Sequence, residues 1–313
     1  MKKVLLLVGL ISILLAAGCG TDASVSPTAT LSASVPSDAQ QPEPTLASSE
    51  LVVGPERFVF GLLDPKTHQP INDVPDVSIQ FFKVHDDGTA TKTGDAQAIF
   101  RNKNLPAGVY VVRTDFTEAG KWGALMTISR QGLQPYSTRV SFDVLAKGSV
   151  PRKGDPAPPS KNDTEQSMGQ SKGNLDQICS AQPHDDMHKL TIAEAVKSGK
   201  PSLILFAAPG FCPSFTCGPD LEVVQTIESK YRDKANFLHI ESPNDIQNQI
   251  RTTHDPNVSK GVDRPQIETA KEWGLHTEPW VFLVDKNGKI FERFEGGLTL
   301  DEVQPEFEKL MQQ

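Results

Sequence analysis

Hydrophobic positions along the chain follow two patterns, separated by stretches rich in Pro, Gly and polar residues. Between residues 51 and 147, short runs alternate apolar and polar positions, with turn-forming segments between them. This period-two alternation predicts half-buried β-strands. The expected strands cover residues 57–63, 77–84, 109–116, 123–130 and 137–145. Several short strands in so compact a region predict a small all-β sandwich.

The opening of this region, GPERFVFGLLD at 54–64, and its expected hairpin DFTEAGKWG at 115–123 resemble immunoglobulin-like envelope domains found beside redox domains.

From residue 175 to residue 313 the pattern alternates between strand and helix. Residues 201–208, PSLILFAA, form a continuous apolar run, typical of a strand covered on both faces. TIAE at 191–194 and TLDE at 299–302 have the spacing of capping boxes, which start helices. The expected order is a helix from 191, a strand at 201–208, a helix at 220–231, a strand at 235–242, a helix at 266–273, a hairpin at 280–296 and a final helix.

The N-terminus has the features of an export signal. A charged MKK start is followed by a short apolar core and by AAGC, which ends at Cys19. Small residues before a cysteine resemble the lipobox of bacterial lipoproteins. The resemblance implies a signal peptide at 1–19, a lipid on the Cys19 sulfur and an outward-facing, membrane-anchored protein. Plain secretion, with Cys19 lost or inert, is the alternative.

Two segments have linker composition. Residues 20–50 are dominated by Ser, Thr, Pro and Ala, which predicts a disordered tether. Residues 148–174 combine Pro, Gly and charge and predict a linker between two domains, at 51–147 and 175–313.

The net charge of the chain and its expected compartment limit the classes of function that the protein could have. The formal net charge of −8 and the lack of a basic stripe exclude nucleic acid as an expected partner. An exported protein meets an oxidising compartment, in which thiols form disulfides.

The candidate chemistry lies in the stretch LFAAPGFCPSFTCGPDLEVV, with Cys212 and Cys217 between an expected strand and an expected helix. On a continuous helix, residues five apart have Cα atoms roughly 8 to 9 Å from each other, whereas a disulfide needs less than about 7 Å. If the two cysteines pair, the segment between them is therefore not regular helix. Pro219 suits the first position of a helix that begins just after Cys217. The positive end of a helix dipole stabilises a thiolate there.

The stretch from Phe206 to Cys212, the second cysteine and TEPWVFLVDKNGK, which contains Pro279, resemble the thioredoxin-like superfamily. The resemblance implies an α/β thioredoxin-like fold and a thiol-disulfide oxidoreductase that acts on protein thiols. Cys212 would attack, Cys217 would resolve the mixed disulfide, and Pro279 would be cis and face the pair. Electrons would come from or pass to another envelope dithiol protein, so no cofactor is expected.

The chain departs from the family in three places. Four residues separate the cysteines instead of two, and Phe206 stands where many thioredoxins bury an Asp below the pair. Glu278 precedes Pro279, where small or β-branched residues are commoner in the family; it is expected to be solvated. Proton handling should therefore differ from that of the family.

Several rival interpretations stay open. The pair could be an inert staple, or it could bind copper with His276, as in Sco-type metallochaperones, because thiolates and an imidazole suit that ion. A lipoprotein that only binds a partner is a third possibility. A peroxiredoxin is disfavoured because Leu205 and Pro209 stand where that family needs Pro and Thr.

A second group of possible metal ligands lies in CSAQPHDDMHKL. Its members are Cys179, His184, Asp185, Asp186 and His188. Pro183 and the loop-like composition favour a solvated loop over a metal site. His239 alternates into an expected strand and is interpreted as a core or edge residue.

Overall fold

A computed structural model describes residues 41–313, apart from 75, 169–171, 213–215, 244 and 247–265. The predicted signal peptide with Cys19 and the first part of the predicted tether lie outside the described residues. Among the described residues, no helix is both long and apolar enough to span a bilayer.

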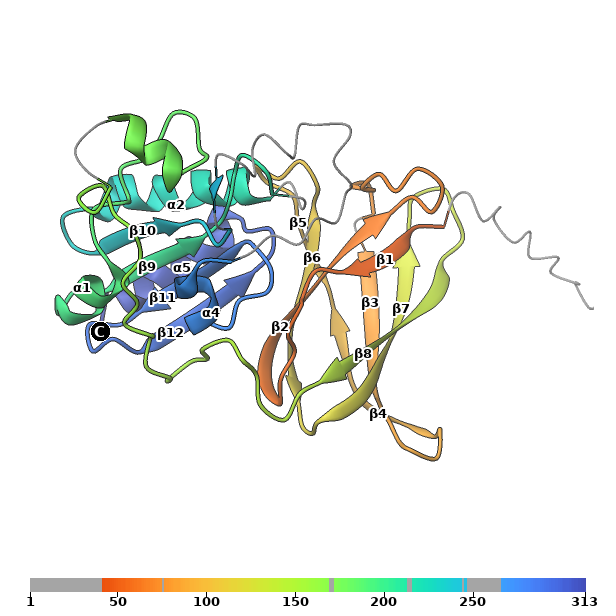
Figure 1. Ribbon diagram of the computed structural model, residues 1–313. Coiled ribbons are helices and arrows are strands. Elements are labelled where there is room, and N and C mark those ends of the chain that lie inside the picture. The colour runs from red at the N-terminus through yellow and green to blue at the C-terminus, as the bar shows by residue number, and fades with distance from the viewer. Residues whose placement is uncertain (1–40, 75, 169–171, 213–215, 244, 247–265) are drawn as a thin grey trace, which may run out of the picture. The chain divides into compact units, whose positions relative to one another are not determined.

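The N-terminal region is a two-layer all-β sandwich, in agreement with the predicted architecture (Figure 1). One sheet has the order β1-β2-β6-β5 and the other β4-β3-β7-β8, and all their pairings are antiparallel. The strands are β1 (Glu43–Leu46), β2 (Gly54–Leu63), β3 (Asp76–Val84), β4 (Ala90–Gln97), β5 (Ile99–Arg101), β6 (Val109–Phe116), β7 (Gly120–Ser129) and β8 (Tyr136–Val144).

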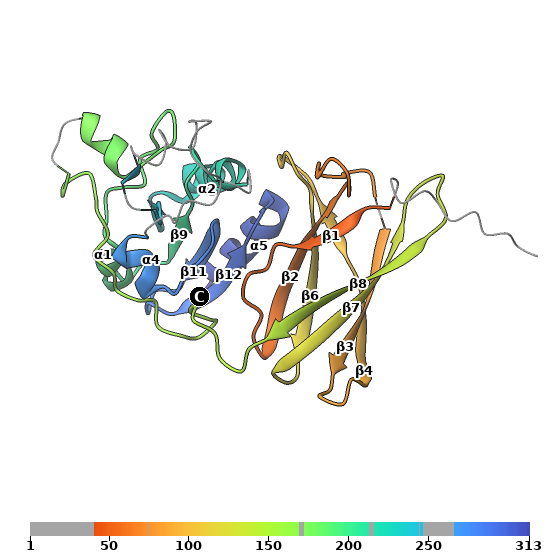
Figure 2. The same cartoon turned by 45° about the vertical axis from the view of Figure 1, so that its right-hand side comes forward.

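The inward positions of both sheets form one aromatic-rich core, whose two layers can be followed in Figure 2. Phe58 of β2 meets Phe81 of β3 edge to face, with ring centroids 5.3 Å apart. Phe116 and Trp122 are in contact in the same way, at 5.0 Å. Every other side chain of β3 and of β7 is buried, as alternation predicts for a sheet with one covered face.

Three strands of the sandwich were not predicted. β4 is almost entirely polar and β5 is very short, so neither shows apolar alternation. β1 lies within residues 20–50 and pairs with β2. The prediction of disorder for that range is therefore wrong for the residues of β1.

The C-terminal region contains a four-stranded sheet with the order β10-β9-β11-β12. β9 and β10 are parallel, whereas β11 runs antiparallel to both β9 and β12. Its elements are α1 (Ile192–Lys197), β9 (Ser202–Phe206), α2 (Cys217–Tyr231), β10 (Asn236–Ile240), α4 (Glu268–Glu272), β11 (Trp280–Val284), β12 (Ile290–Glu295) and α5 (Leu300–Leu310), with a short 3-10 helix, η2 (Lys172–Gln177), before them.

Helices cover both faces of this sheet (Figure 1). α2 and α5 pack on the face that carries Leu203 and Leu205, while α1 and α4 pack on the face of Ile204 and Phe206. All residues of β9 are buried, which explains the continuous apolar run at 201–208. The order β-α-β-α-β-β-α is the one that the resemblance to thioredoxins implies.

The two predicted capping boxes have different outcomes. At α1 the Thr191 side chain accepts a hydrogen bond from the Glu194 N–H, and Glu194 reaches back to the Thr191 N–H, so the box is confirmed. At α5 Thr299 makes no capping bond through its side chain, so that prediction is wrong. Glu302, which would complete the second box, instead binds Arg57 of the sandwich.

The segment predicted as an interdomain linker is packed against the C-terminal sheet. The Ala157 N–H donates to the Gly288 carbonyl (2.9 Å), and the Ser160 carbonyl accepts from the Ala193 N–H (2.9 Å). Val150 and Ala157 are buried in the core that includes α1 and α4. The described part of residues 148–174 lacks helix before η2 and lacks a long strand, as predicted, but it belongs to the C-terminal domain.

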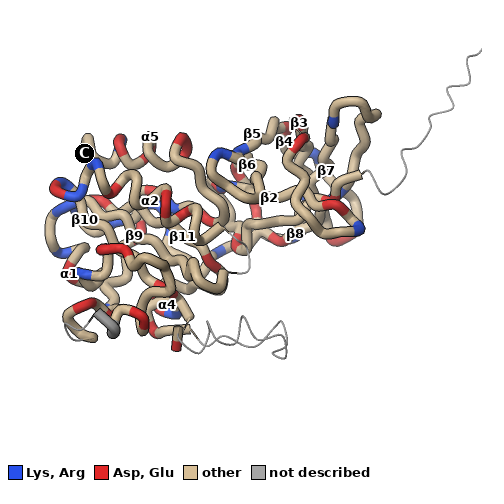
Figure 3. The backbone as a smooth tube through the Cα atoms, turned by 90° about the horizontal axis from the view of Figure 1, so that it is seen from above, with Lys and Arg blue, Asp and Glu red and all other residues tan. Residues whose placement is uncertain are grey.

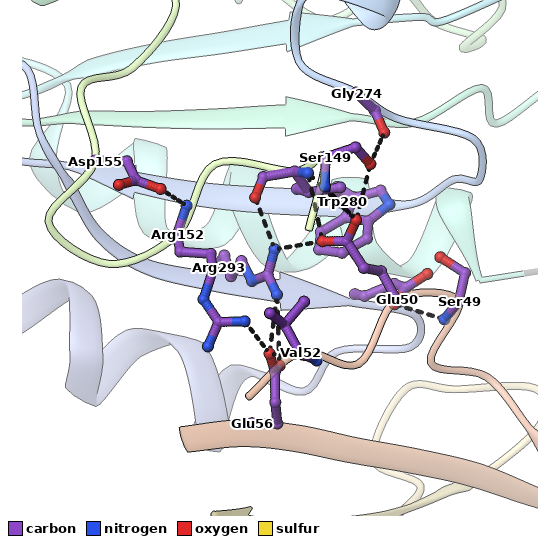
Figure 4. Close-up of polar contacts among 12 residues, drawn as sticks. Ser49, Glu50, Val52, Glu56, Ser149, Arg152, Asp155, Gly274, Trp280 and Arg293 are labelled. Carbon is purple, nitrogen blue, oxygen red and sulfur yellow. Dashed lines mark hydrogen bonds and ion pairs between the residues drawn. The ribbon is translucent and has the colours of Figure 1, made fainter. Parts of the chain in front are cut away.

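Charged side chains connect the sandwich to the C-terminal domain. Glu56 accepts hydrogen bonds from Arg152 (2.6 Å) and Arg293 (3.2 Å), and Glu50 accepts from Ser149 (2.6 Å), as Figure 4 shows. Beside Glu56 on β2, Arg57 makes two hydrogen bonds of 2.8 Å to Glu302. Adjacent residues of opposite charge on one strand therefore dock the sandwich onto β12 and α5.

Candidate redox site

The two central cysteines form a disulfide. The Cys212 and Cys217 Sγ atoms are bonded, and their Cα atoms lie 6.0 Å apart. That separation is within the range that a disulfide requires and is shorter than a regular helix would give. The pairing shows that these cysteines are close enough to form a disulfide. Residues 213–215 between them lie outside the described residues.

The local sequence places the pair at a helix N-terminus. Cys217 is the first residue of α2, with Thr216 at the N-cap, so the helix begins slightly before the predicted start. Cys212 is 9% exposed and Cys217 is fully buried. The resemblance assigned the attack to Cys212, which is the more exposed of the two residues. The positive end of the α2 dipole favours a thiolate on either sulfur once the disulfide is reduced.

Pro279 has the isomer that the resemblance implied: the Glu278–Pro279 peptide bond is cis. Pro279 directly precedes β11, whose first residue, Trp280, pairs with Phe206 at the end of β9. The proline therefore stands beside the strand end that leads into the Cys212 loop. Glu278 is half-buried and accepts a hydrogen bond from the Ser242 N–H (2.8 Å), so the expectation of a solvated Glu278 is wrong.

A buried carboxyl group lies close to the pair, although the strand lacks one. Phe206 is fully buried in the core, but Asp220, one turn after Cys217 on α2, is also fully buried. Asp220 Oδ1 accepts from the Leu298 N–H (2.8 Å), and Oδ2 has no hydrogen-bond partner among the described residues. Burial raises the pKa of Asp220 well above its usual value, while the hydrogen bond from Leu298 and the charge of Arg57 oppose the shift.

A cleft borders this region. Its volume is about 1190 Å³, and Thr216, His276 and Pro279 line one side while residues of β1 and β2 line another. His276, the proposed copper ligand, is exposed. Residues of both domains therefore line the cleft.

The predicted solvated loop at 179–188 contains a buried polar cluster instead. Cys179, Asp185, His188 and His239 offer ligand atoms that all lie within 4.8 Å of one another. His188 is 2% exposed, so its predicted solvation is wrong, whereas the buried position of His239 is confirmed. His184 is not part of the cluster and contacts Asp176 (2.7 Å).

The ionisation of this cluster is strongly coupled. Burial raises the pKa of the Cys179 thiol, but hydrogen bonding with His188 and His239 outweighs burial and lowers that pKa to about 6. Burial lowers the pKa of His188, but its interactions with Asp185 and Cys179 raise it to about 9. Nearby, burial raises the pKa of Glu241 to about 8.

Positively and negatively charged residues are mixed along the chain. Lys and Arg positions are interspersed with Asp and Glu positions along the described backbone (Figure 3). Basic positions are therefore not gathered in one element of the described backbone, which agrees with the acidic composition.

The strand order, the disulfide at the start of α2 and the cis-proline before β11 together define a thioredoxin-like fold in the C-terminal domain. No known family profile matches the chain, and no curated protein does.

Solved structures show similarity to parts of the chain. MTB DsbF, in mixed oxidised and reduced forms, is 19% identical, with 44% of this chain and 96% of that chain covered and a TM-score of 0.28. A putative thiol:disulfide interchange protein DsbE from Chlorobium tepidum is 15% identical, with 52% and 99% covered and a TM-score of 0.33. A thioredoxin-like protein in its oxidised form is 16% identical, with 51% and 96% covered and a TM-score of 0.30. Similarities this low carry no argument about activity.

Proposed function

We propose that the protein is a membrane-anchored, extracytoplasmic thiol-disulfide oxidoreductase that uses Cys212 and Cys217. The observation that carries the proposal is the disulfide at the N-terminus of α2, with Cys212 as its more exposed sulfur. The lipid anchor at Cys19 and the outward location are supported by the N-terminal sequence. The sandwich, for which we infer an immunoglobulin-like origin, supplies one wall of the cleft.

In the reductive direction, the Cys212 thiolate attacks a sulfur of a substrate disulfide. A mixed disulfide forms, and one substrate thiolate leaves. Cys217 then loses its proton and attacks the Cys212 sulfur, which releases the second substrate thiolate and restores the 212–217 disulfide. Two electrons pass from the protein to the substrate, and an envelope dithiol protein must return them. The oxidative direction is the same sequence reversed.

Asp220 is the group best placed to exchange the proton of Cys217. It lies one turn along α2, it is buried, and its raised pKa brings the carboxyl closer to the range in which it gains and loses a proton at neutral pH. The carboxyl therefore comes from the helix instead of from the strand position that Phe206 occupies.

The test is a redox titration of the full chain, followed by mass spectrometry of the 212–217 pair. An exchange-active pair should have a potential above about −300 mV, whereas a lower value indicates a structural staple. In envelope preparations Cys217→Ser should accumulate mixed disulfides through Cys212, and Cys212→Ser should not.

The alternative functions give different results in the same preparation. Stoichiometric copper uptake that depends on His276 and on both cysteines would support the metallochaperone interpretation. Partner binding that survives Cys212→Ser, together with an inert pair, would support a binding lipoprotein.

A further inference from the structure

Four buried side chains from two distant parts of the sequence lie close together near the loop after β9 that carries Cys212. Cys179, Asp185 and His188 come from the segment before α1, and His239 comes from β10. Their exposed fractions are 1%, 8%, 2% and 2%. Ionisable groups are rarely buried together unless they are paired or bind a metal ion.

The spacing of the ligand atoms suits a small tetrahedral ion. Asp185 Oδ2 lies 2.7 Å from His239 Nδ1 and 3.7 Å from Cys179 Sγ, and Asp185 Oδ1 lies 3.3 Å from His188 Nε2. With zinc–ligand distances of about 2.0 to 2.3 Å, neighbouring ligands of a tetrahedral site lie roughly 3.3 to 3.7 Å apart. Two of the three observed separations, 3.3 and 3.7 Å, fall in that range, and the third, 2.7 Å, is shorter.

The orientation of His239 is that of a metal ligand. Its Nε2 lies 2.9 Å from the Ala207 carbonyl, to which it donates its proton. In a neutral ring this leaves the Nδ1 lone pair facing the Asp185 carboxylate, and two acceptors repel each other unless a cation or a proton lies between them. A backbone carbonyl that fixes the outer nitrogen of a histidine is the usual arrangement around protein-bound metals.

His188 gives a second, independent indication. Its Nε2 is buried, faces Asp185 and satisfies the geometry of a hydrogen bond with none of the described residues. A buried ring nitrogen left without a hydrogen bond is costly, and coordination of a metal ion would satisfy it.

We propose that Cys179, Asp185, His188 and His239 bind one zinc ion. One thiolate, one carboxylate and two imidazoles form a mixed donor set that suits zinc, and the two negative charges balance a divalent cation. The side chains supply four ligands, so the site is closed and structural. A catalytic role for Cys179 as a nucleophile does not fit its 1% exposure.

The site would secure the loop that carries Cys212. Ser180, next to Cys179, accepts a hydrogen bond from the Gly210 N–H (2.8 Å), two residues before Cys212. The Ala207 carbonyl bound by His239 lies in the same stretch after β9. An ion at the cluster would therefore tie the segment 179–188 to β10 and to the base of the redox loop.

The test is metal analysis of the full chain purified without chelators. We expect about one zinc per chain. Cys179→Ser and His188→Gln should each reduce the zinc content at least tenfold. Asp186→Asn is the matched control, because Asp186 lies next to Asp185 in the same segment but its side chain is 53% exposed and pairs with Lys189, and this variant should keep its zinc.

Two measurements keep the proposal testable if a variant fails to fold. Cobalt added to the metal-free wild type should give tetrahedral d–d absorption and a thiolate-to-cobalt charge-transfer band. Zinc added to that protein should raise its melting temperature, since a ligand that binds the folded state stabilises it. The control Cys212→Ser/Cys217→Ser should bind zinc as the wild type does, which separates this site from the proposed redox function. Wild-type protein with less than a tenth of an equivalent of zinc and no response to added cobalt would overturn the proposal, as would zinc that is lost from the Cys212→Ser/Cys217→Ser control.

Discussion

The ion pair between Arg57 and Glu302 should be the most sensitive single point of the domain interface. Its side chains are only 4% and 6% exposed. The Arg57 guanidinium also donates to the carbonyls of Glu295 and Gly297. Burial disfavours ionisation of Glu302, yet the charge and hydrogen bonding of Arg57, together with the charges of Arg101 and Arg113, outweigh burial and keep the pKa of Glu302 below its usual value.

Arg57→Met would remove both hydrogen bonds to the Glu302 carboxylate, which would keep only its ion pair with Arg101 (3.5 Å), and would leave two buried carbonyls without this donor. Removal of one member of a buried pair costs about 3 to 5 kcal/mol. The double variant Arg57→Met/Glu302→Leu removes both charges and should recover most of this loss, because replacing a whole buried pair with apolar groups is nearly neutral or stabilising.

The measurement is urea unfolding of the full chain, followed by tryptophan fluorescence, which reports both domains through Trp122 and Trp280. Arg130→Met is the matched control. Arg130 also makes two hydrogen bonds to a carboxylate, that of Asp73, but its partner's side chain is 63% exposed, so we expect a loss below about 1 kcal/mol. Equal losses for Arg57→Met and Arg130→Met would refute the conclusion that burial makes the Arg57 pair important.

Three further predictions follow from single positions. Asp220→Asn should stabilise the protein, and by more as the pH rises above the pKa of an unfolded Asp. The raised pKa of Asp220 makes the native state bind more protons than the unfolded state above that pH, so the stability of the wild type falls as the pH rises. Urea unfolding across a pH series measures the difference, and parallel stability curves for the two proteins would contradict the prediction. Gly274→Ala should destabilise more than Gly199→Ala, since both glycines have φ near +70° (65° and 73°) but a Cβ at 274 would lie 2.4 Å from the Ser149 carbonyl oxygen, whereas that at 199 meets open space; equal melting temperatures would contradict the clash. Thr191→Ala should lower the free energy of unfolding by about 1 kcal/mol, because it removes the capping box of α1. An unchanged midpoint of urea unfolding would show that the cap does not contribute to stability.

Helices, strands and turns with a clear local sequence pattern were predicted from the sequence. The fully buried, largely apolar β9 and the Asn287–Gly288 turn of the β11–β12 hairpin were evident from sequence, because each depends on neighbouring residues. β4 escaped prediction because it is polar, and β1 because pairing with β2, a distant contact, stabilises it.

The candidate site divides in the same way. The cysteine pair and Pro279 could be found because their positions, between a strand and a helix and before a hairpin, match a known arrangement although the cysteine spacing does not. Cys179, Asp185 and His188 were recognised as possible ligands, but their burial could not be predicted because His239 joins them from a strand far along the chain. Asp220 was missed since an acidic residue in the first turn of a helix is ordinarily exposed, whereas here Leu298 and the interface cover it. The sequence signal for this cluster was that Cys179, His184 and His188 all lie within six residues of Asp185.

The contacts between the two domains have a consequence for whether the domains can separate and come together again. If the sandwich separated from the C-terminal domain, water would hydrate the charged groups uncovered around Glu56, Arg57 and Arg293. The separation would also uncover apolar side chains, since Leu105 and Val109 lie against Gly297, so the hydrophobic effect would drive the two domains back together.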